Sequence, residues 1–125
     1  MINLGTCVGE GRYRVEISAI LTGNGISVLL TGGEKPHIGA VVMSIPRNSL
    51  SGEGISSDSW VLPVPSHKDV EAAKLVAELI CRSTGQVTVV TAGIHIARAE
   101  EWELDTLLQN CIQAAKQLCL DISMR

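Results

Sequence analysis

The chain has 125 residues, which is enough for one domain with its own hydrophobic core. Nearly half of the residues are apolar, yet no apolar run approaches the ~20 residues that span a bilayer, and the first residues lack the pattern of a signal peptide. The net charge of −3 and the dispersed basic residues exclude nucleic acid as the main partner. We therefore expect a single cytoplasmic domain over residues 1–125 that contacts neither membrane nor nucleic acid.

The first third of the chain predicts antiparallel strands. A short strand near residues 3–8 is followed by a glycine-containing turn and then by residues 12–22, in which apolar and polar side chains alternate. This period of two is typical of a half-buried strand. Gly23-Asn24-Gly25 supplies residues that tolerate positive φ, so it predicts a hairpin to the next strand.

Residues 25–31 and 38–45 are predicted to be strands that are apolar on both faces. Helices can cover one face of such strands, but the other face then needs a ligand or a second subunit. We therefore expect a homodimer. The polar, Gly/Ser-rich residues 46–59 are predicted to form a long loop, followed by a short strand at residues 60–62.

The second half of the chain predicts two helices. Ser66 is expected to cap the first, with Asp69 three residues later as in a capping box, and Gly85 to end it. A β-branched strand follows at residues 86–91, and acidic residues favour a last helix starting near Glu100. Without βαβα alternation, the order of elements predicts an α+β fold: a mainly antiparallel, twisted sheet of five to six strands with two helices on one face.

The pattern of cysteines predicts reduced thiols. Four are scattered along the chain without a CxxC pair, and three of them fall on apolar helix faces. We expect free thiols in or near the core, and neither a disulfide framework nor a thiolate metal site. No nucleophile–base or paired-carboxylate arrangement stands out, so hydrolase and transferase chemistry have no support from the sequence.

Each of the three histidines lies at a junction between regular elements. His37 lies between two strands, His67 lies beside Lys68 at the first turn of a helix, and His95 follows the β-branched strand. Polar side chains can converge on a ligand at strand ends and helix N-termini. We therefore expect a ligand site here, although a solvated loop position is the alternative for any one of these histidines.

The kind of ligand stays open at this stage. Three imidazoles can bind a divalent metal, and His67 with Lys68 at a helix N-terminus can equally bind an anion. Gly32-Gly33 matches neither a dinucleotide nor a Walker motif, so these glycines either make a turn or let a ligand approach. Arg47 at a strand end can reach a phosphate or lie in solvent, and Trp60 can stack on a flat ring or pack in a core or interface.

Three segments together resemble the LpdD family, the accessory subunit of UbiD-type hydroxyarylic acid decarboxylases. They are Leu30-Thr31-Gly32-Gly33-Glu34-Lys35-Pro36-His37-Ile38-Gly39-Ala40-Val41, His67-Lys68-Asp69 and Ala92-Gly93-Ile94-His95-Ile96. The resemblance runs from about residue 12 to 112. It implies a fold similar to that of the small proteasome assembly chaperones, which form dimers.

The resemblance also implies a binding protein and not an enzyme. Its ligand would be prenylated FMN, or FMN, carried from the flavin prenyltransferase to the decarboxylase, with a divalent metal as an additional ligand. The matching contact positions would be His37, His67 and His95, with Gly32, Gly33 and Lys68 near them. Two alternatives remain: a protein-assembly chaperone without a small-molecule ligand, and a small metal-dependent enzyme that uses the three histidines.

Overall fold

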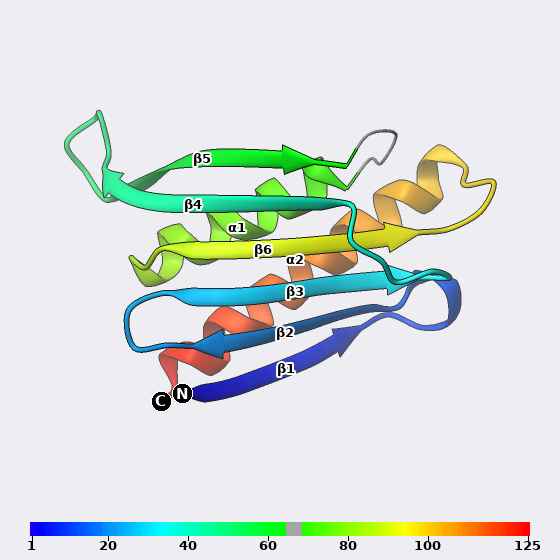
Figure 1. The fold of residues 1–125 in the computed structure, drawn as a ribbon, viewed down its shortest axis with the longest axis horizontal. Coiled ribbons are helices and arrows are strands. Elements are labelled where there is room, and N and C mark those ends of the chain that lie inside the picture. The colour runs from blue at the N-terminus through cyan, green and yellow to red at the C-terminus, as the bar shows by residue number, and fades with distance from the viewer. Residues whose placement is uncertain (65–68) are drawn as a thin grey trace.

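The computed structural model describes residues 1–64 and 69–125, which form six strands and two α-helices (Figure 1). The predicted α+β class is confirmed. In chain order the elements are β1 (Ile2–Val8), a 3-10 helix (Gly11–Tyr13), β2 (Val15–Leu21), β3 (Ile26–Gly33), β4 (Ala40–Asn48), β5 (Ile55–Pro63), α1 (Val70–Thr84), β6 (Thr88–His95) and α2 (Glu101–Ser123).

The strands form one sheet in the order β1-β2-β3-β6-β4-β5. β6 pairs in parallel with β3 and antiparallel with β4, and the remaining pairs are antiparallel. The sheet is therefore mainly antiparallel, as predicted. Because β6 lies between β3 and β4, the connecting residues 34–39 have to cross β6.

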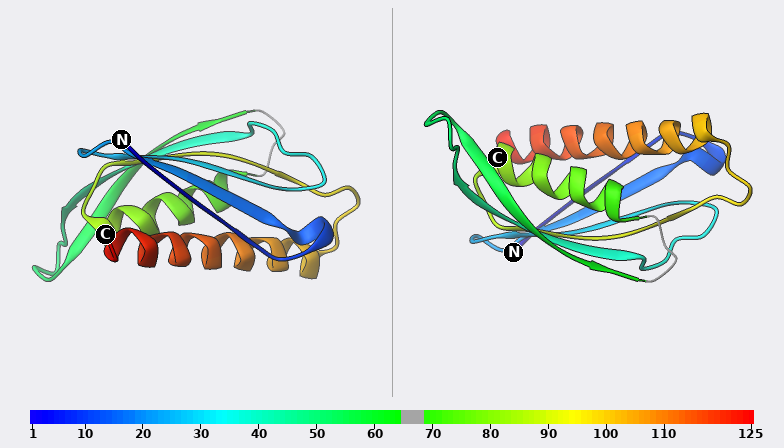
Figure 2. Two further views of the ribbon diagram at one scale, coloured as in Figure 1. Left: turned by 90° about the horizontal axis from the view of Figure 1, so that it is seen from below. Right: turned by 90° about the horizontal axis from the view of Figure 1, so that it is seen from above.

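Both helices lie along one face of the sheet, so the molecule has two layers (Figure 2). Alternate positions of the central strands point into the core between these layers, as the period of two requires. Neither helix of the described residues combines the length and the apolar composition that a membrane span needs. The core contains mostly aliphatic side chains, among them Ile17, Val28, Leu30, Val42, Val90, Val76, Ile80, Leu107 and Leu118.

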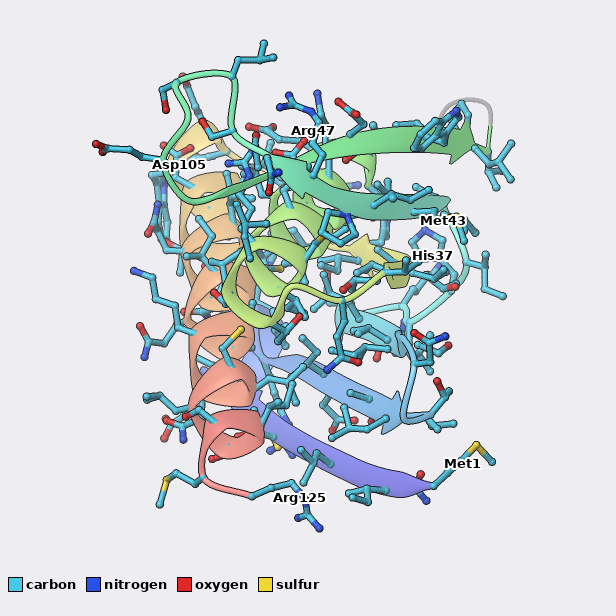
Figure 3. The ribbon with its side chains drawn as sticks, turned by 90° about the vertical axis from the view of Figure 1, so that its left-hand side faces the viewer. Met1, His37, Met43, Arg47, Asp105 and Arg125 are labelled. Atoms are coloured by element: carbon cyan, nitrogen blue, oxygen red, sulfur yellow. The ribbon has the colours of Figure 1, made fainter. Side chains whose placement is uncertain are left out.

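The face of the sheet opposite the helices is exposed and largely apolar. We call it the open face. Met43 lies on this side, away from the helix layer (Figure 3). The prediction that β3 and β4 carry apolar residues on both faces is confirmed, while dimerisation stays a prediction. The large apolar residues of the open face include Ile20, Leu29, Met43, Ile45, Trp60 and Leu62.

The predicted long loop over residues 46–59 is wrong. β4 continues to Asn48 and β5 begins at Ile55, so only a short connection remains. The polar residues that suggested a loop belong to β5, an edge strand that is free to carry them. Pro46 is tolerated because the pairing of β4 with β6 ends at Ser44, so a proline there removes no hydrogen bond to β6.

Other boundaries differ by a few residues. The predicted strand at 12–22 starts later because residues 11–13 form the 3-10 helix. β3 and β6 run further than predicted because their last residues pair with each other, up to Gly33 with His95. The predicted helix ends are confirmed: Gly85 ends α1 at φ 67°, and α2 begins with a capping box. The predicted cap at Ser66 lies outside the described residues.

Candidate functional site

The site lies at the end of the sheet where β3 and β6 both finish. In Figure 1 this is the right-hand end, where residues 34–39 and the starts of both helices also gather. Since β3 and β6 are parallel, their carboxyl ends meet at the same edge. The rings of His37 and His95 lie 6.5 Å apart between centroids and nearly perpendicular to each other. The structure thus brings together two of the three predicted histidines.

Asp69 connects His37 to β6 and to the start of α1. Its Oδ2 lies 3.0 Å from His37 Nε2, and its Oδ1 accepts a hydrogen bond of 2.8 Å from the Ile94 N–H. The Asp69 residue is 4% exposed, so its charge needs such partners. The Nδ1 of His37 in turn lies 2.8 Å from the Lys35 carbonyl oxygen. The imidazole of His37 is therefore held from both sides.

The prediction for Asp69 needs correction. The sequence suggested the third position of a capping box after Ser66, but Asp69 stands at the N-cap position itself. Its carboxylate bridges three parts of the chain that are far apart in sequence. No local pattern signals such a bridge, because it exists only once residues 34–39 cross β6.

Glycines make this crossing possible. A side chain at Gly93 would overlap the His37 backbone, and one at Gly39 would overlap the Asp69 carboxylate. The glycines that were predicted to contact a ligand also serve close packing: a Cβ at Gly32 would lie 2.7 Å from the Arg14 carbonyl oxygen, and one at Gly33 would overlap the His95 carbonyl. Contact of Gly32 and Gly33 with a ligand stays a prediction.

Hydrogen bonds also fasten residues 34–39 to the connection between β6 and α2. The Glu34 N–H donates to the His95 carbonyl at 2.7 Å, and its Oε1 accepts from the Ala97 N–H at 2.9 Å. Arg12 donates to the Ala97 carbonyl at 2.7 Å. No local pattern marks Glu34 or Arg12 as site residues, since these partners lie more than 60 residues away. These contacts hold both histidine-bearing segments in place.

A cavity of about 440 Å³ lies next to His95, between the first turns of α1 and α2. Its wall is mixed, with apolar side chains and three carboxylates, those of Asp69, Glu71 and Asp105. No pattern in the sequence signals this cavity, because it depends on how the two helices pack. The remaining lining residues are apolar or sulfur-bearing: Ala72, Ile94, Ile96, Ala99, Leu104, Leu107, Leu108 and Cys111.

Cys111 is unsuited to nucleophilic chemistry. Its side chain is fully buried, and burial, followed by the nearby charge of Asp69, raises the pKa of the Cys111 thiol to about 12. The thiol is therefore neutral at physiological pH, and the thiolate is the reactive form of cysteine. Cys111 contributes an apolar surface to the cavity.

A metal site is not formed by the residues that the structure describes. Within residues 1–64 and 69–125, no three His, Cys, Asp or Glu side chains are grouped so that they could hold an ion. His67 falls outside these ranges, as does Lys68. The predicted metal site of His37, His67 and His95 therefore stays a prediction.

Two other residues singled out from the sequence lie elsewhere. Arg47 is seven residues along β4 from Ala40, roughly 23 Å at ~3.3 Å per residue, and its Nε donates to Asp58 Oδ1 at 2.9 Å. It therefore lies far from the two histidines. Trp60 is 58% exposed on the open face, so it does not belong to the core.

The fold is that of a small α+β domain, with a cavity next to a pair of histidines at one end of its sheet. The sequence matches the prenylated flavin chaperone LpdD-like domain family over residues 9–123, and the chain belongs to this family. The resemblance inferred from the sequence is thereby confirmed, and family membership supports a chaperone or accessory role. No curated protein matches the sequence.

A chain from the crystal structure of a novel chaperone complex for yeast 20S proteasome assembly has the same fold. The TM-score is 0.60, and the match covers 98% of this chain and 94% of that chain. The expected similarity in fold to proteasome assembly chaperones is confirmed. At 16% sequence identity the likeness concerns the fold alone.

Proposed function

We propose that this chain binds prenylated FMN without catalysing a reaction, and carries it from the flavin prenyltransferase to a UbiD-type decarboxylase in the cytoplasm. The observation that carries the proposal is the cavity beside His95 and the His37–Asp69 pair, in a chain of the prenylated flavin chaperone family. A reduced prenylated flavin is sensitive to oxygen. A carrier that keeps solvent away from the ring therefore serves the decarboxylase that uses it.

The described residues fit the ring system of this cofactor. A volume of about 440 Å³ falls within the ~300–1,000 Å³ of typical small-molecule sites. Ile94, Leu107 and Leu108 offer apolar surface to the ring and its added isoprenoid carbons, and His95 can orient a polar edge. The bound flavin supplies the reactive ring for the decarboxylase, while the residues of this chain bind it, orient it and exclude water.

Three of the remaining predicted contacts are part of the proposal and one is not. His37 is placed beside His95, and His67 and Lys68 precede Asp69 directly in the sequence, so all three are proposed contacts. Arg47 is left out because it lies at the opposite end of β4. Metal analysis of the purified protein tests the separate proposal that the histidines also hold a divalent ion.

Flavin titration tests the proposed function. Addition of prenylated FMN should change its absorbance and raise the Tm, since a ligand that binds only the native state at 100 times its Kd stabilises it by about 2.7 kcal/mol. FMN itself should bind more weakly, because it lacks the isoprenoid carbons. If neither flavin changes the Tm at saturating concentration, the carrier function is excluded.

A matched pair of variants locates the binding. His95→Ala removes an exposed ring from the rim of the cavity and should weaken flavin binding by about 1 kcal/mol, which is roughly fivefold. Lys116→Ala, on the exposed side of α2 and away from the cavity, should bind flavin as the unmodified chain does. Equal affinities of both variants would contradict the assignment of His95.

We also propose that the open face pairs with a second copy of the chain. Its large apolar residues come from four strands and lie on a twisted sheet that can pack against another sheet at ~10 Å. Leu29→Glu should yield a monomer in light scattering at concentrations where the unmodified chain is a dimer. Leu120→Glu, which changes an exposed leucine on α2, should stay dimeric. A monomeric mass for the unmodified chain would overturn this proposal.

A second candidate function is a protein-assembly chaperone without a small-molecule ligand. The exposed apolar residues of the open face favour it, because such patches commonly mark protein–protein contacts. The two functions differ in whether they require flavin. A flavin carrier should transfer cofactor to an apo-decarboxylase, whereas an assembly chaperone should act on its partner equally well in flavin-free solution.

A further inference from the structure

The carboxylates around the cavity restrict which part of a flavin it can take. Asp69, Glu71 and Asp105 all line it, and the described lining residues include neither lysine nor arginine. A phosphate monoester carries close to two negative charges at neutral pH. Charges of the same sign repel each other more strongly in a partly enclosed space than in water, because the effective dielectric constant is lower there.

The helix N-termini beside the cavity do not offset this charge. The N-terminus of a helix carries partial positive charge and can bind a phosphate, but in α2 the capping box already takes up this position, and in α1 carboxylates lie beside it. In α2 the side chains of Glu100 and Glu103 bond to each other's backbone N–H groups in a capping box. In α1 the first turn contains Glu71, two residues after the buried Asp69, whose carboxylate bonds to the Ile94 N–H and makes no capping bond to the helix. A phosphate at either N-terminus would therefore lie close to carboxylates of the same turn.

The depth of the cavity is apolar. Leu107 and Cys111 are buried at its wall, Ile94 comes from the end of β6, and Ile96 follows that strand directly. Burial raises the pKa of the Cys111 thiol to about 12, so no charge arises at this point of the wall. An uncharged ring with alkyl substituents gains from such a surface, whereas a charged group loses its hydration.

From these features we infer that the cavity receives the uncharged, alkyl-bearing ring of the flavin and that the phosphate stays outside it, on the side away from Glu71 and Asp105. This inference rests on the proposed flavin-binding function and adds an orientation to it. The chain then recognises the part of the cofactor that distinguishes prenylated FMN from FMN. The carboxylates also select against phosphate-bearing ligands that lack an apolar ring.

Riboflavin and FMN test the orientation directly, because they share the ring and differ in the phosphate. Riboflavin should bind as tightly as FMN or more tightly, measured by quenching of flavin fluorescence at low ionic strength. The double variant Glu71→Gln/Asp105→Asn should strengthen FMN binding about fivefold and leave riboflavin unchanged. Glu101→Gln removes an exposed charge from the same turn of α2 without touching the cavity wall, and it should alter neither affinity.

A second pair of variants shows whether the ring occupies this cavity. Ala99→Leu fills part of its volume and should weaken both flavins by the same factor, whereas Ala97→Leu, outside the lining, should weaken neither. Far-UV circular dichroism and the Tm show whether each variant is folded.

The outcomes separate the orientation from the carrier function. FMN binding at least tenfold tighter than riboflavin, with no gain in the double variant, would overturn the orientation and leave the carrier function intact. Absence of binding by riboflavin, FMN and prenylated FMN in the unmodified chain would overturn both.

Discussion

The two faces of the sheet are built from similar residues but have different surroundings. On one side, α1 and α2 cover a core of small and medium aliphatic side chains that are almost completely buried. On the other side, residues of the same strands, such as Leu29 and Met43, are exposed over a third or more of their surface. An apolar residue is therefore not evidence of a core in this chain. Only the covered face contributes fully to the stability of a single subunit.

Leu29 and Leu30 are adjacent in β3 and allow the sharpest test of this difference. Leu30 is fully buried and Leu29 is 46% exposed. Leu30→Ala should lower the free energy of unfolding by about 2–5 kcal/mol, because it leaves a cavity in the core. Leu29→Ala should cost about 1 kcal/mol or less in urea denaturation of a dilute sample, since half of its surface is already in water.

Protein concentration extends this comparison to the proposed dimer. If a second copy covers the open face, the cost of Leu29→Ala should grow with concentration, whereas that of Leu30→Ala should change little. Equal costs for both variants in a monomeric sample would contradict the difference between the two faces.

Gly93 marks the place where the open face is covered by the chain itself. By register it lies on the open face beside Thr31, and residues 34–39 cross it. Gly93→Ala should cost about 1–3 kcal/mol, because its methyl group has to displace the His37 backbone. Thr91→Ala, two residues earlier on the same face, should cost less than about 1 kcal/mol.

The Gly93→Ala variant also tests the site. Displacement of the His37 backbone pulls its ring away from Asp69, which should appear as a shift of the His37 signals in an NMR spectrum. An unchanged spectrum together with unchanged stability would show that residues 34–39 do not rest on β6.

The sequence predicts most of this fold because much of it depends on local patterns. The alternation within 12–22, the glycines of the first hairpin and the acidic start of α2 each reflect forces between near neighbours in sequence. The strand predicted at residues 60–62 is the end of β5. Its first half, from Ile55, escaped prediction because the usual strand signal is apolar alternation, and these residues are mostly polar. The position of β6 between β3 and β4 depends on contacts between residues more than 40 positions apart.

The site likewise has features that local sequence patterns predict and features that depend on contacts between distant residues. His37 and His95 were found because each stands at a junction where a strand begins or ends. The partnership of Asp69 with His37, and the cavity beside them, arise only when α1, α2 and β6 meet. Arg47 shows the opposite error: it was placed just after a strand end, but it lies within β4, at the end of the sheet opposite the histidines.

The reaction rates of the cysteine thiols compare the two faces without any substitution in the chain. Cys7 is exposed on β1, in the row of the open face that contains Glu16, whereas Cys111 is buried beneath the helices. With a pKa of about 12, only roughly one Cys111 thiol in a thousand would be ionised at pH 9 even if it were accessible. A disulfide reagent should therefore modify Cys7 rapidly in the native protein, and Cys111 only when the chain unfolds.

Cys119 should react at an intermediate rate, because it is partly buried and burial raises the pKa of its thiol. A Cys7→Ser variant should lose only the fast phase, which assigns that phase without altering the fold. If the open face forms the proposed dimer, the fast rate should also fall as protein concentration rises, while the slow rates stay constant. A rapid reaction of Cys111 in native buffer would mean that the helices do not close over their side of the sheet, and the contrast between the two faces would then be lost.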